Sequence, residues 1–170
     1  LKDGKEVLNS SDIIVQLGIL SGDKTSNIKE NQTLIGVLNP YNNKEKLESL
    51  AKKKINLFSL ELLPRITRAQ SMDILSSQAN LAGYKAVIES FANFKKAIPM
   101  MMTAAGTIPA AKVLVVGAGV AGLQAIATAK RMGAIVFATD VRMASKEQVE
   151  SLGGKFLTVE GSENLETEGG

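Results

Sequence analysis

Six consecutive residues, Gly117-Ala118-Gly119-Val120-Ala121-Gly122, carry the clearest chemical pattern in the sequence. They follow an apolar run, Val113 to Val116, and open an apolar helical pattern, which is the setting in which a glycine turn binds phosphates. In that setting we expect Gly117 to permit the tight turn, Gly119 to let the backbone approach a pyrophosphate, and Gly122 to let the helix pack against the strand. The phosphates would then meet the helix N-terminus.

Asp140 lies eighteen residues beyond Gly122, where the next apolar run ends. A carboxylate at a strand end can accept hydrogen bonds from both hydroxyls of a ribose and repels a 2′-phosphate, so the pattern favours NAD over NADP, although Arg142 would partly compensate. Two plainer interpretations stay open: a turn that needs glycines only for its shape, and an Asp140 that caps a helix or faces solvent. The predicted cofactor-binding residues are Gly117, Ala118, Gly119, Val120, Ala121, Gly122, Asp140, Val141 and Arg142.

A second group of polar residues follows Pro64, in the run from Arg65 to Ser77. Loops at strand ends are where α/β folds place ligand contacts. We expect Thr67 to Gln70 to form a capping box and a helix to follow. Gln70, Asp73 and Ser76 would then share one broad helix face, with Arg65 before it. The patterning leaves equally open that this group is a helix cap with an ordinary surface ion pair.

The elements that hold these residues follow from the apolar patterning, which is typical of the α/β class with β-α-β winding. The first half predicts strands at 12–20, 34–38 and 55–62, a Lys/Glu helix at 43–54, a loop at 22–31, and Pro64 closing the last strand. A long or broken helix is expected at 70–96, followed by an irregular apolar stretch at 99–109 that packs between two lobes. The second half predicts strands at 113–116, 134–139 and 155–157, helices at 120–132 and 145–152, and a mobile tail at 160–170.

The same patterning divides the chain into a first lobe at 1–69, a connecting helix region at 70–98 and a nucleotide-binding lobe at 99–170, with the domain junction at 99–109. The 170 residues are 45% hydrophobic and 22% charged, which is typical of a soluble globular protein. Because the chain starts with Leu1 and ends with Gly170 after Glu168 and Gly169, we expect it to be an excerpt of a longer protein.

Composition excludes several kinds of chemistry. The chain has no Cys and no His, so disulfides, thiol catalysis and the usual neutral-pH acid–base group are excluded, and we predict no metal site. A net charge of +3 and few aromatic residues do not indicate nucleic-acid binding. No apolar run reaches the roughly 20 residues of a membrane span, and no signal peptide is visible.

Two longer stretches make a resemblance specific: Pro64-Arg65-Ile66-Thr67-Arg68-Ala69-Gln70-Ser71-Met72-Asp73, and the run from Ala104 to Val113. With the glycine turn, Asp140 and the run from Lys146 to Ser151, they resemble the NAD(H)-binding component, the alpha subunit, of proton-translocating nicotinamide nucleotide transhydrogenases. The resemblance covers essentially the whole chain. It implies two Rossmann-like lobes, each a partial, doubly wound parallel sheet, flanking a cleft.

In function, the resemblance implies hydride transfer between NAD(H) on this chain and NADP(H) on a partner component, coupled to proton movement through a transmembrane component. It implies a homodimer on the soluble face, in cytoplasm or organelle matrix, of an energy-transducing membrane. The family's hydride-transfer residues fall on Arg65, Gln70, Asp73 and Ser76. Hydride exchange removes no substrate proton, so it requires positioning rather than acid–base catalysis, and the absence of His is compatible with it.

Two rival functions stay in view. An alanine dehydrogenase resembles this family in fold, but where its pattern has a lysine-bearing strand this chain reads Val15-Gln16-Leu17-Gly18, and Asn39 stands in place of its histidine. A non-catalytic NAD-sensing module would keep the glycine turn and use the polar group near Gln70 for a partner. A membrane segment and a second nucleotide-binding component in the whole protein would discriminate against both.

Overall fold

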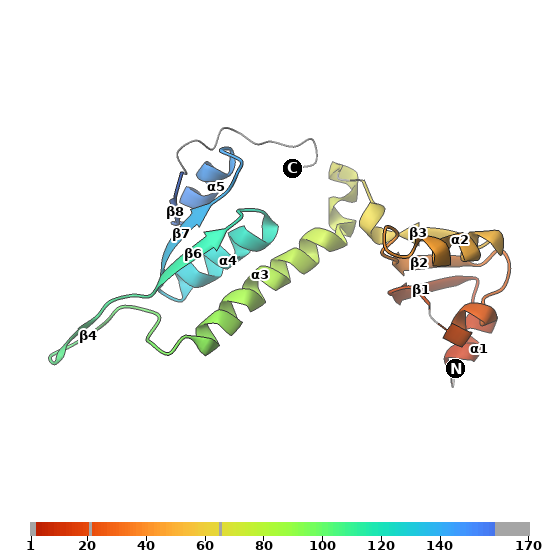
Figure 1. Ribbon diagram of the computed structural model, residues 1–170, viewed down its shortest axis with the longest axis horizontal. Coiled ribbons are helices and arrows are strands. Elements are labelled where there is room, and N and C mark those ends of the chain that lie inside the picture. Colours follow the sequence, from red (N-terminus) through yellow and green to blue (C-terminus); the bar gives the residue numbers. More distant parts are fainter. Residues whose placement is uncertain (1–2, 21, 65, 159–170) are drawn as a thin grey trace. The chain divides into compact units, whose positions relative to one another are not determined.

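The computed structural model describes residues 3–20, 22–64 and 66–158 (Figure 1). The chain forms two compact units, Leu1–Leu75 and Ser76–Gly170. Each unit contains its own parallel sheet and its own apolar core, so the predicted α/β class is confirmed. The division predicted from the sequence, at 1–69, 70–98 and 99–170, stays a prediction, as does the cleft.

The first unit is a three-stranded parallel sheet in the order β1-β2-β3. Gly36 of β2 is paired with Gln16 of β1, and an added Cβ would come 2.1 Å from the Gln16 carbonyl oxygen, so the two strands pack there without a side chain between them. The core consists of buried aliphatic side chains, of which Leu34, Leu38 and Leu50 are almost fully enclosed. In chain order the elements are α1 (Gly4–Ser10), β1 (Ile13–Leu17), η1 (Gly22–Asn27), β2 (Thr33–Val37), α2 (Lys44–Lys52), β3 (Asn56–Ser59), η2 (Leu60–Leu62) and η3 (Thr67–Met72), where η denotes a 3₁₀ helix.

The second unit repeats this arrangement with the sheet order β6-β7-β8, again parallel. Its core includes Ile126, Val136 and Val149, which join α4, β7 and α5. β4 and β5 form a separate antiparallel hairpin whose residues are all exposed. In chain order the elements are α3 (Ile74–Asn93), β4 (Met101–Thr103), β5 (Gly106–Ile108), β6 (Lys112–Val116), α4 (Val120–Arg131), β7 (Ile135–Thr139), α5 (Ser145–Ser151) and β8 (Lys155–Phe156).

Most predicted strands and helices are confirmed within a few residues, and the structure differs from the prediction at a few places. The expected long or broken helix is a broken one, because Asp73 has extended backbone angles (φ −73°, ψ 93°) that separate the 3₁₀ helix η3 from α3, which begins at Ile74. Residues 22–31 are not all loop, since η1 lies within them. β3 ends at Ser59, so the short helix η2, rather than Pro64, follows the strand directly.

The stretch predicted to be irregular, residues 99–109, is also different, because the β4–β5 hairpin occupies most of it. Gly106 has φ +137°, a conformation that favours glycine, directly after the two-residue turn. The stretch is therefore a regular two-stranded hairpin rather than an irregular segment. The tail predicted at 160–170 lies outside the described residues.

Candidate functional site

The glycine turn connects the end of β6 to the start of α4. Gly117 has φ +95°, the left-handed region in which an L side chain is strained, and its N–H donates to the Thr139 carbonyl oxygen of β7 at 2.8 Å. The turn is therefore fixed to the neighbouring strand by a backbone hydrogen bond. Its sharpness depends on the missing side chain, as predicted for Gly117.

Gly119 and Gly122 lack side chains for different reasons. No described atom lies within 4 Å of a Cβ built on Gly119, which is the N-cap of α4 and accepts a 2.8 Å hydrogen bond from the Leu123 N–H. A Cβ on Gly122 would lie 1.8 Å from the Gly117 carbonyl oxygen and 3.5 Å from Val115. The space above Gly119 is open to a ligand, whereas Gly122 is required for the helix to pack on the turn and the strand.

The first turn of α4 has the electrostatics of an anion site. The N–H groups of Val120, Ala121 and Gly122 belong to the first turn, where an α-helix offers no backbone acceptor, and they carry the positive end of the helix dipole. The first turn of α4 contains no acidic side chain, and the last turn of α4 contains two basic residues, Lys130 and Arg131. The arrangement favours a phosphate or pyrophosphate at the N-terminus.

Asp140 follows β7 directly and lies beside the glycine turn. Its side chain is only 6% exposed. One carboxylate oxygen, Oδ2, accepts a 2.6 Å hydrogen bond from the Ala118 N–H, and the other, Oδ1, accepts from the Arg142 N–H at 2.8 Å and from Arg142 Nε at 3.1 Å. Arg142 Nη2 lies 3.5 Å from Oδ2. The carboxylate thus ties the turn after β6 to the loop after β7.

These contacts lower the pKa of Asp140 to about 2. Burial alone would raise it, but the side-chain hydrogen bond from Arg142, the backbone N–H groups of Arg142 and Ala118, and the charge of the guanidinium together outweigh burial. Asp140 is therefore ionised at neutral pH. Its negative charge stands where a ribose or a 2′-phosphate would meet it if the turn binds a dinucleotide.

The two other predicted residues in this loop differ in exposure. The Arg142 side chain is 34% exposed and uses part of its hydrogen-bonding capacity on Asp140, while Val141 is 56% exposed and offers an apolar surface beside the carboxylate. Ala118, in contrast, is only 1% exposed and packs in the core of the second unit. Ala118 can therefore contribute its backbone but not its side chain to a ligand.

The polar group after Pro64 does not form the single helix face that was expected. Gln70 is exposed in η3, and its carbonyl oxygen accepts a 3.2 Å hydrogen bond from the Asp73 N–H, whereas Ser76 lies in the first turn of α3. The expected capping box is wrong as well, because Thr67 is the first residue of η3 and Ile66 is its N-cap. Arg65 lies outside the described residues.

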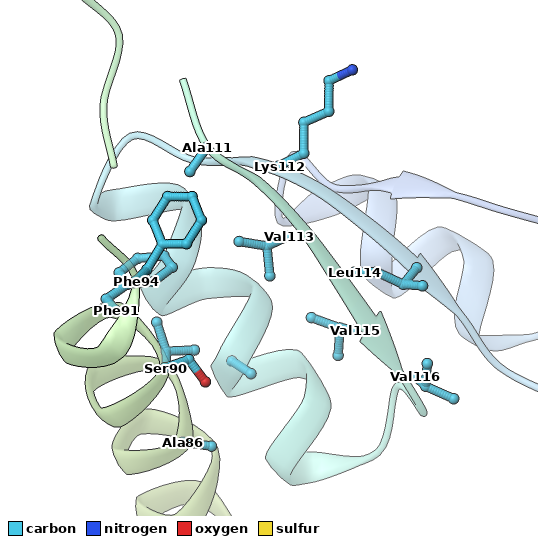
Figure 2. A pocket seen from close by; sticks show the side chains of 12 residues that line it. Ala86, Ser90, Phe91, Phe94, Ala111, Lys112, Val113, Leu114, Val115 and Val116 are labelled. Carbon is cyan, nitrogen blue, oxygen red and sulfur yellow. The ribbon is translucent and has the colours of Figure 1, made fainter. Parts of the chain in front are cut away.

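An apolar groove of about 420 Å³ lies between α3 and β6 in the second unit, lined by Phe91 and Phe94 on one side and Val113 and Val115 on the other (Figure 2). Figure 2 shows Val113 and Val115 pointing toward α3, while Lys112 points away from the groove. The lining offers no cluster of donors for phosphates. The groove therefore does not have the chemistry of a dinucleotide site.

Two features of the site were missed from the sequence. The bond from the Ala118 N–H to Asp140 has no sequence signal, because it depends on β6 and β7 being neighbours. Gly83, in the middle of α3, does have one: an isolated glycine in a helical pattern indicates a packing or functional reason. A Cβ on Gly83 would lie 2.0 Å from the Ala121 carbonyl oxygen, in the first turn of α4.

The first unit has a polar cluster of its own at the carboxyl ends of its strands. Glu61 accepts hydrogen bonds from the Asn39 N–H at 2.5 Å, the Leu38 N–H at 3.2 Å and the Ser59 hydroxyl at 2.5 Å. Burial raises the pKa of Glu61, but these hydrogen bonds outweigh it and lower the pKa overall. The carboxylate therefore satisfies the backbone donors at the end of β2, where Asn39 has φ +47°.

Comparisons with known proteins cover both units. The family described as alanine dehydrogenase/PNT matches with its N-terminal domain at residues 1–82 and its C-terminal domain at residues 86–168. A Rhodospirillum rubrum protein, named as the first portion of an NAD(P) transhydrogenase subunit alpha, is 62% identical over 150 residues, which is 87% of this chain and 39% of that protein. Its namesake in Rickettsia prowazekii is 54% identical over 169 residues, 97% of this chain and 44% of that protein. The chain thus spans less than half the length of these curated relatives.

Solved structures agree with these matches. The crystal structure of a transhydrogenase from Sinorhizobium meliloti matches with a TM-score of 0.87 and 54% identity, over 92% of this chain and 45% of that chain. An L-alanine dehydrogenase matches with a TM-score of 0.73 at 20% identity, over 92% of this chain and 44% of that one. At that identity the second likeness concerns the fold alone.

Proposed function

Since the chain belongs to the alanine dehydrogenase/PNT family, with relatives that are transhydrogenase alpha subunits, we propose that it is the NAD(H)-binding part of a proton-translocating transhydrogenase. Hydride passes directly between NAD(H) held by this chain and NADP(H) held by a partner component. The transfer is coupled to proton movement through a transmembrane component. The observation that carries the proposal is the glycine turn with Asp140 beside it.

The residues of the second unit fit a dinucleotide. No described atom stands where a Gly119 side chain would point, so a pyrophosphate can approach the turn there and accept hydrogen bonds from the N–H groups of Val120 to Gly122. Asp140, ionised and next to the turn, accepts hydrogen bonds from a ribose. The bound nicotinamide supplies the hydride, and the protein supplies binding, orientation and exclusion of competing reactions.

In this proposal Asp140 also makes the site selective for NADH over NADPH. Its charge repels a 2′-phosphate, and the Arg142 guanidinium that would offset this repulsion is already hydrogen-bonded to Asp140 itself. We expect the intact protein to bind NADH more tightly than NADPH in a fluorescence titration. Asp140→Ala is expected to weaken NADH binding more than NADPH binding, and equal affinities of the unaltered protein for the two would refute the selectivity.

Four residues, Arg65, Gln70, Asp73 and Ser76, serve hydride transfer in this proposal. Gln70 donates to the nicotinamide carboxamide, Arg65 orients the carboxamide or a phosphate, and Asp73 and Ser76 fix the ring and Arg65. The exposure of the Gln70 side chain is compatible with a ligand contact. Their part is positioning, because the reaction moves a hydride and no proton of a substrate.

The experiment is Gln70→Asn in the intact protein, reconstituted with the NADP(H)-bearing partner. A displacement of about 1 Å slows hydride transfer on the order of 100-fold, with NADH affinity little changed. Gln78→Asn, the same shortening at an exposed position of α3, is the matched control and keeps the full rate. Full-rate transfer with Gln70→Asn would remove Gln70 from the catalytic machinery.

The assembly follows from the same proposal. The chain works as a homodimer with an NADP(H)-binding component and a transmembrane component, on the cytoplasmic or matrix face of an energy-transducing membrane. None of the helices in the described part of the chain is long and apolar enough to cross a membrane. Affinity purification of the intact protein from its membranes is expected to recover an NADP(H)-binding partner.

Amino-acid dehydrogenation is the rival outcome of the test. In the first unit Gln16 and Asn39 carry uncharged amides, so neither position supplies a cation for a substrate carboxylate. Their side chains hydrogen-bond locally: Gln16 Nε2 donates to the Gly18 carbonyl oxygen at 2.6 Å, and Asn39 accepts from Asn42 at 3.0 Å. We expect no alanine-dependent reduction of NAD, and hydride exchange once the partner is added. If the protein oxidises alanine and its hydride exchange does not increase when the partner is added, the transhydrogenase proposal is wrong and only NAD binding remains supported.

A further inference from the structure

Gly83 lies in the middle of α3 and is buried within the second unit. One turn further along α3, Val87 is buried in the same core cluster as Ala118, the second residue of the glycine turn. Residues four apart lie on one face of a helix, so Gly83 and Val87 share the face of α3 that packs toward α4. The Gly83 face of α3 therefore packs on the N-terminal turn of α4, which is the terminus where phosphates would bind.

The approach at Gly83 is closer than any side chain allows. An added Cβ would lie 2.0 Å from the Ala121 carbonyl oxygen, 2.8 Å from its carbonyl carbon and 3.0 Å from its Cα. All three atoms are backbone, so no rotation of a side chain relieves the overlap. A methyl group at Gly83 requires either α3 or the first turn of α4 to move.

Local structure gives no reason for a glycine at this position. Apart from proline, glycine is the least favourable residue in a helix interior, and alanine is the most favourable. Helix propensity therefore predicts that Gly83→Ala stabilises α3. Packing against Ala121 predicts the opposite, and the two effects have different consequences for ligand binding.

We propose that Gly83 is a positioning residue for the pyrophosphate site, acting through the backbone of Ala121. By seating α3 directly on the first turn of α4, it sets the place of the Val120 and Gly122 N–H groups. The inference rests on the proposed function, in that these groups bind the pyrophosphate of NAD(H). It adds that α3, which carries Ser76 in its first turn, also determines the geometry of the phosphate site.

The test compares ADP, which has a pyrophosphate, with adenosine, which has none, by calorimetric titration of the intact protein. Gly83→Ala is expected to raise the Kd for ADP ~10-fold and the Kd for adenosine less than ~2-fold, because only the phosphate contacts move. Ala82→Ser, which adds one atom at an exposed neighbouring position, changes neither value. A merely structural role for Gly83 would leave the ratio of the two Kd values unchanged and would overturn the inference.

Amide hydrogen exchange of the unaltered protein tests the same idea without any substitution. Saturating ADP is expected to slow exchange in α3 around Gly83 as well as in the first turn of α4, and protection of α4 alone would overturn the inference. The failure of the proposed function is distinguishable from either result. If the dinucleotide-binding part of the proposed function fails, the unaltered protein binds neither ADP nor NADH, whereas failure of the inference alone leaves both bound normally.

Discussion

The two units of the chain each contain a parallel sheet of the same kind, and they differ in what stands at the carboxyl ends of the strands. Each is a three-stranded parallel sheet whose strands follow one another in chain order. In the first unit the carboxyl ends of the strands are closed by Glu61, whose carboxylate accepts hydrogen bonds from the backbone of Leu38 and Asn39. In the second unit a helix N-terminus stands at that position, with open space above Gly119.

Parallel β-α-β winding alone therefore does not make a nucleotide site. Both units place polar groups at the carboxyl ends of parallel strands, as α/β folds do. In the first, the Glu61 side chain accepts from the backbone donors that follow β2. In the second, Asp140 accepts from the Ala118 N–H, but the N–H groups in the first turn of α4 stay open to a ligand. Substitutions in either unit, followed by measurement of both stability and NADH affinity, test this contrast.

The largest effect is expected from Gly122→Val, which places a side chain against the Gly117 carbonyl oxygen, 1.8 Å from the Cβ position. The overlap moves α4 away from the turn, so NADH affinity falls by ~100-fold or more and stability falls by about 3 kcal/mol. Fluorescence titration and urea unfolding measure the two effects. Gly119→Ala separates the effect on binding from the effect on stability, because the added methyl group meets no described atom of the protein within 4 Å. The free energy of unfolding should be unchanged while NADH binding weakens.

Gly36→Ala is the counterpart in the first unit. Its Cβ would lie 2.1 Å from the Gln16 carbonyl oxygen, so β1 and β2 must separate and stability falls by about 2 kcal/mol. NADH affinity of the folded protein should not change, because the substitution lies in the unit without the glycine turn. Gly4→Ala, with no described atom within 4 Å, is the control for adding a methyl group. A Gly36→Ala protein that unfolds normally but loses NADH would contradict the contrast.

Ionisation of Asp140 makes the stability of the second unit depend on pH. The pKa of Asp140 is lowered in the folded state to about 2 from 3.8, so its ionised form stabilises the fold above about pH 4, and this contribution is lost as the pH falls toward 2. Asp140→Asn should therefore be about 2 kcal/mol less stable at neutral pH, with the gap closing near pH 2. Unfolding by urea across this pH range checks it.

The smallest effect is expected from Glu61→Gln. The amide retains one acceptor oxygen but loses the other, so one of the donors at Leu38, Asn39 or Ser59 goes unpaired. Because Glu61 is only half-buried, the loss should be about 1 kcal/mol, with NADH affinity unaffected. Thermal unfolding with Glu48→Gln as an exposed control measures it. Since the pKa of Glu61 is lowered on folding, the difference should shrink as the pH falls below its unfolded value.

Much of the fold follows from local patterning, and the exceptions have identifiable causes. Strands β2, β6 and β7 are continuous apolar runs, and the glycine turn has a fixed spacing, so both are visible in the sequence. The start of α3 was missed because Asp73 breaks a helical pattern through its backbone angles, which composition does not reveal. The hairpin at 101–108 was missed because its short strands lack a polar alternation.

The candidate site could be predicted only in part. The residue types and spacing indicate a phosphate turn and a nearby carboxylate, because those depend on one β-α-β unit. The contact between Gly83 and Ala121 joins segments about forty residues apart, and the bond from Ala118 to Asp140 joins neighbouring strands. Such contacts depend on tertiary packing, which a local pattern does not encode.

The hydrogen bonds of Asp140 have a consequence for the thermodynamics of binding. A carboxylate offers about four acceptor positions, and Ala118 and Arg142 already donate to both oxygens of Asp140. A ribose hydroxyl that reaches this carboxylate therefore trades places with an existing donor, most readily with Arg142 Nη2 at 3.5 Å. Recognition at Asp140 is an exchange, so its heat signal should be small even though its contribution to selectivity is large.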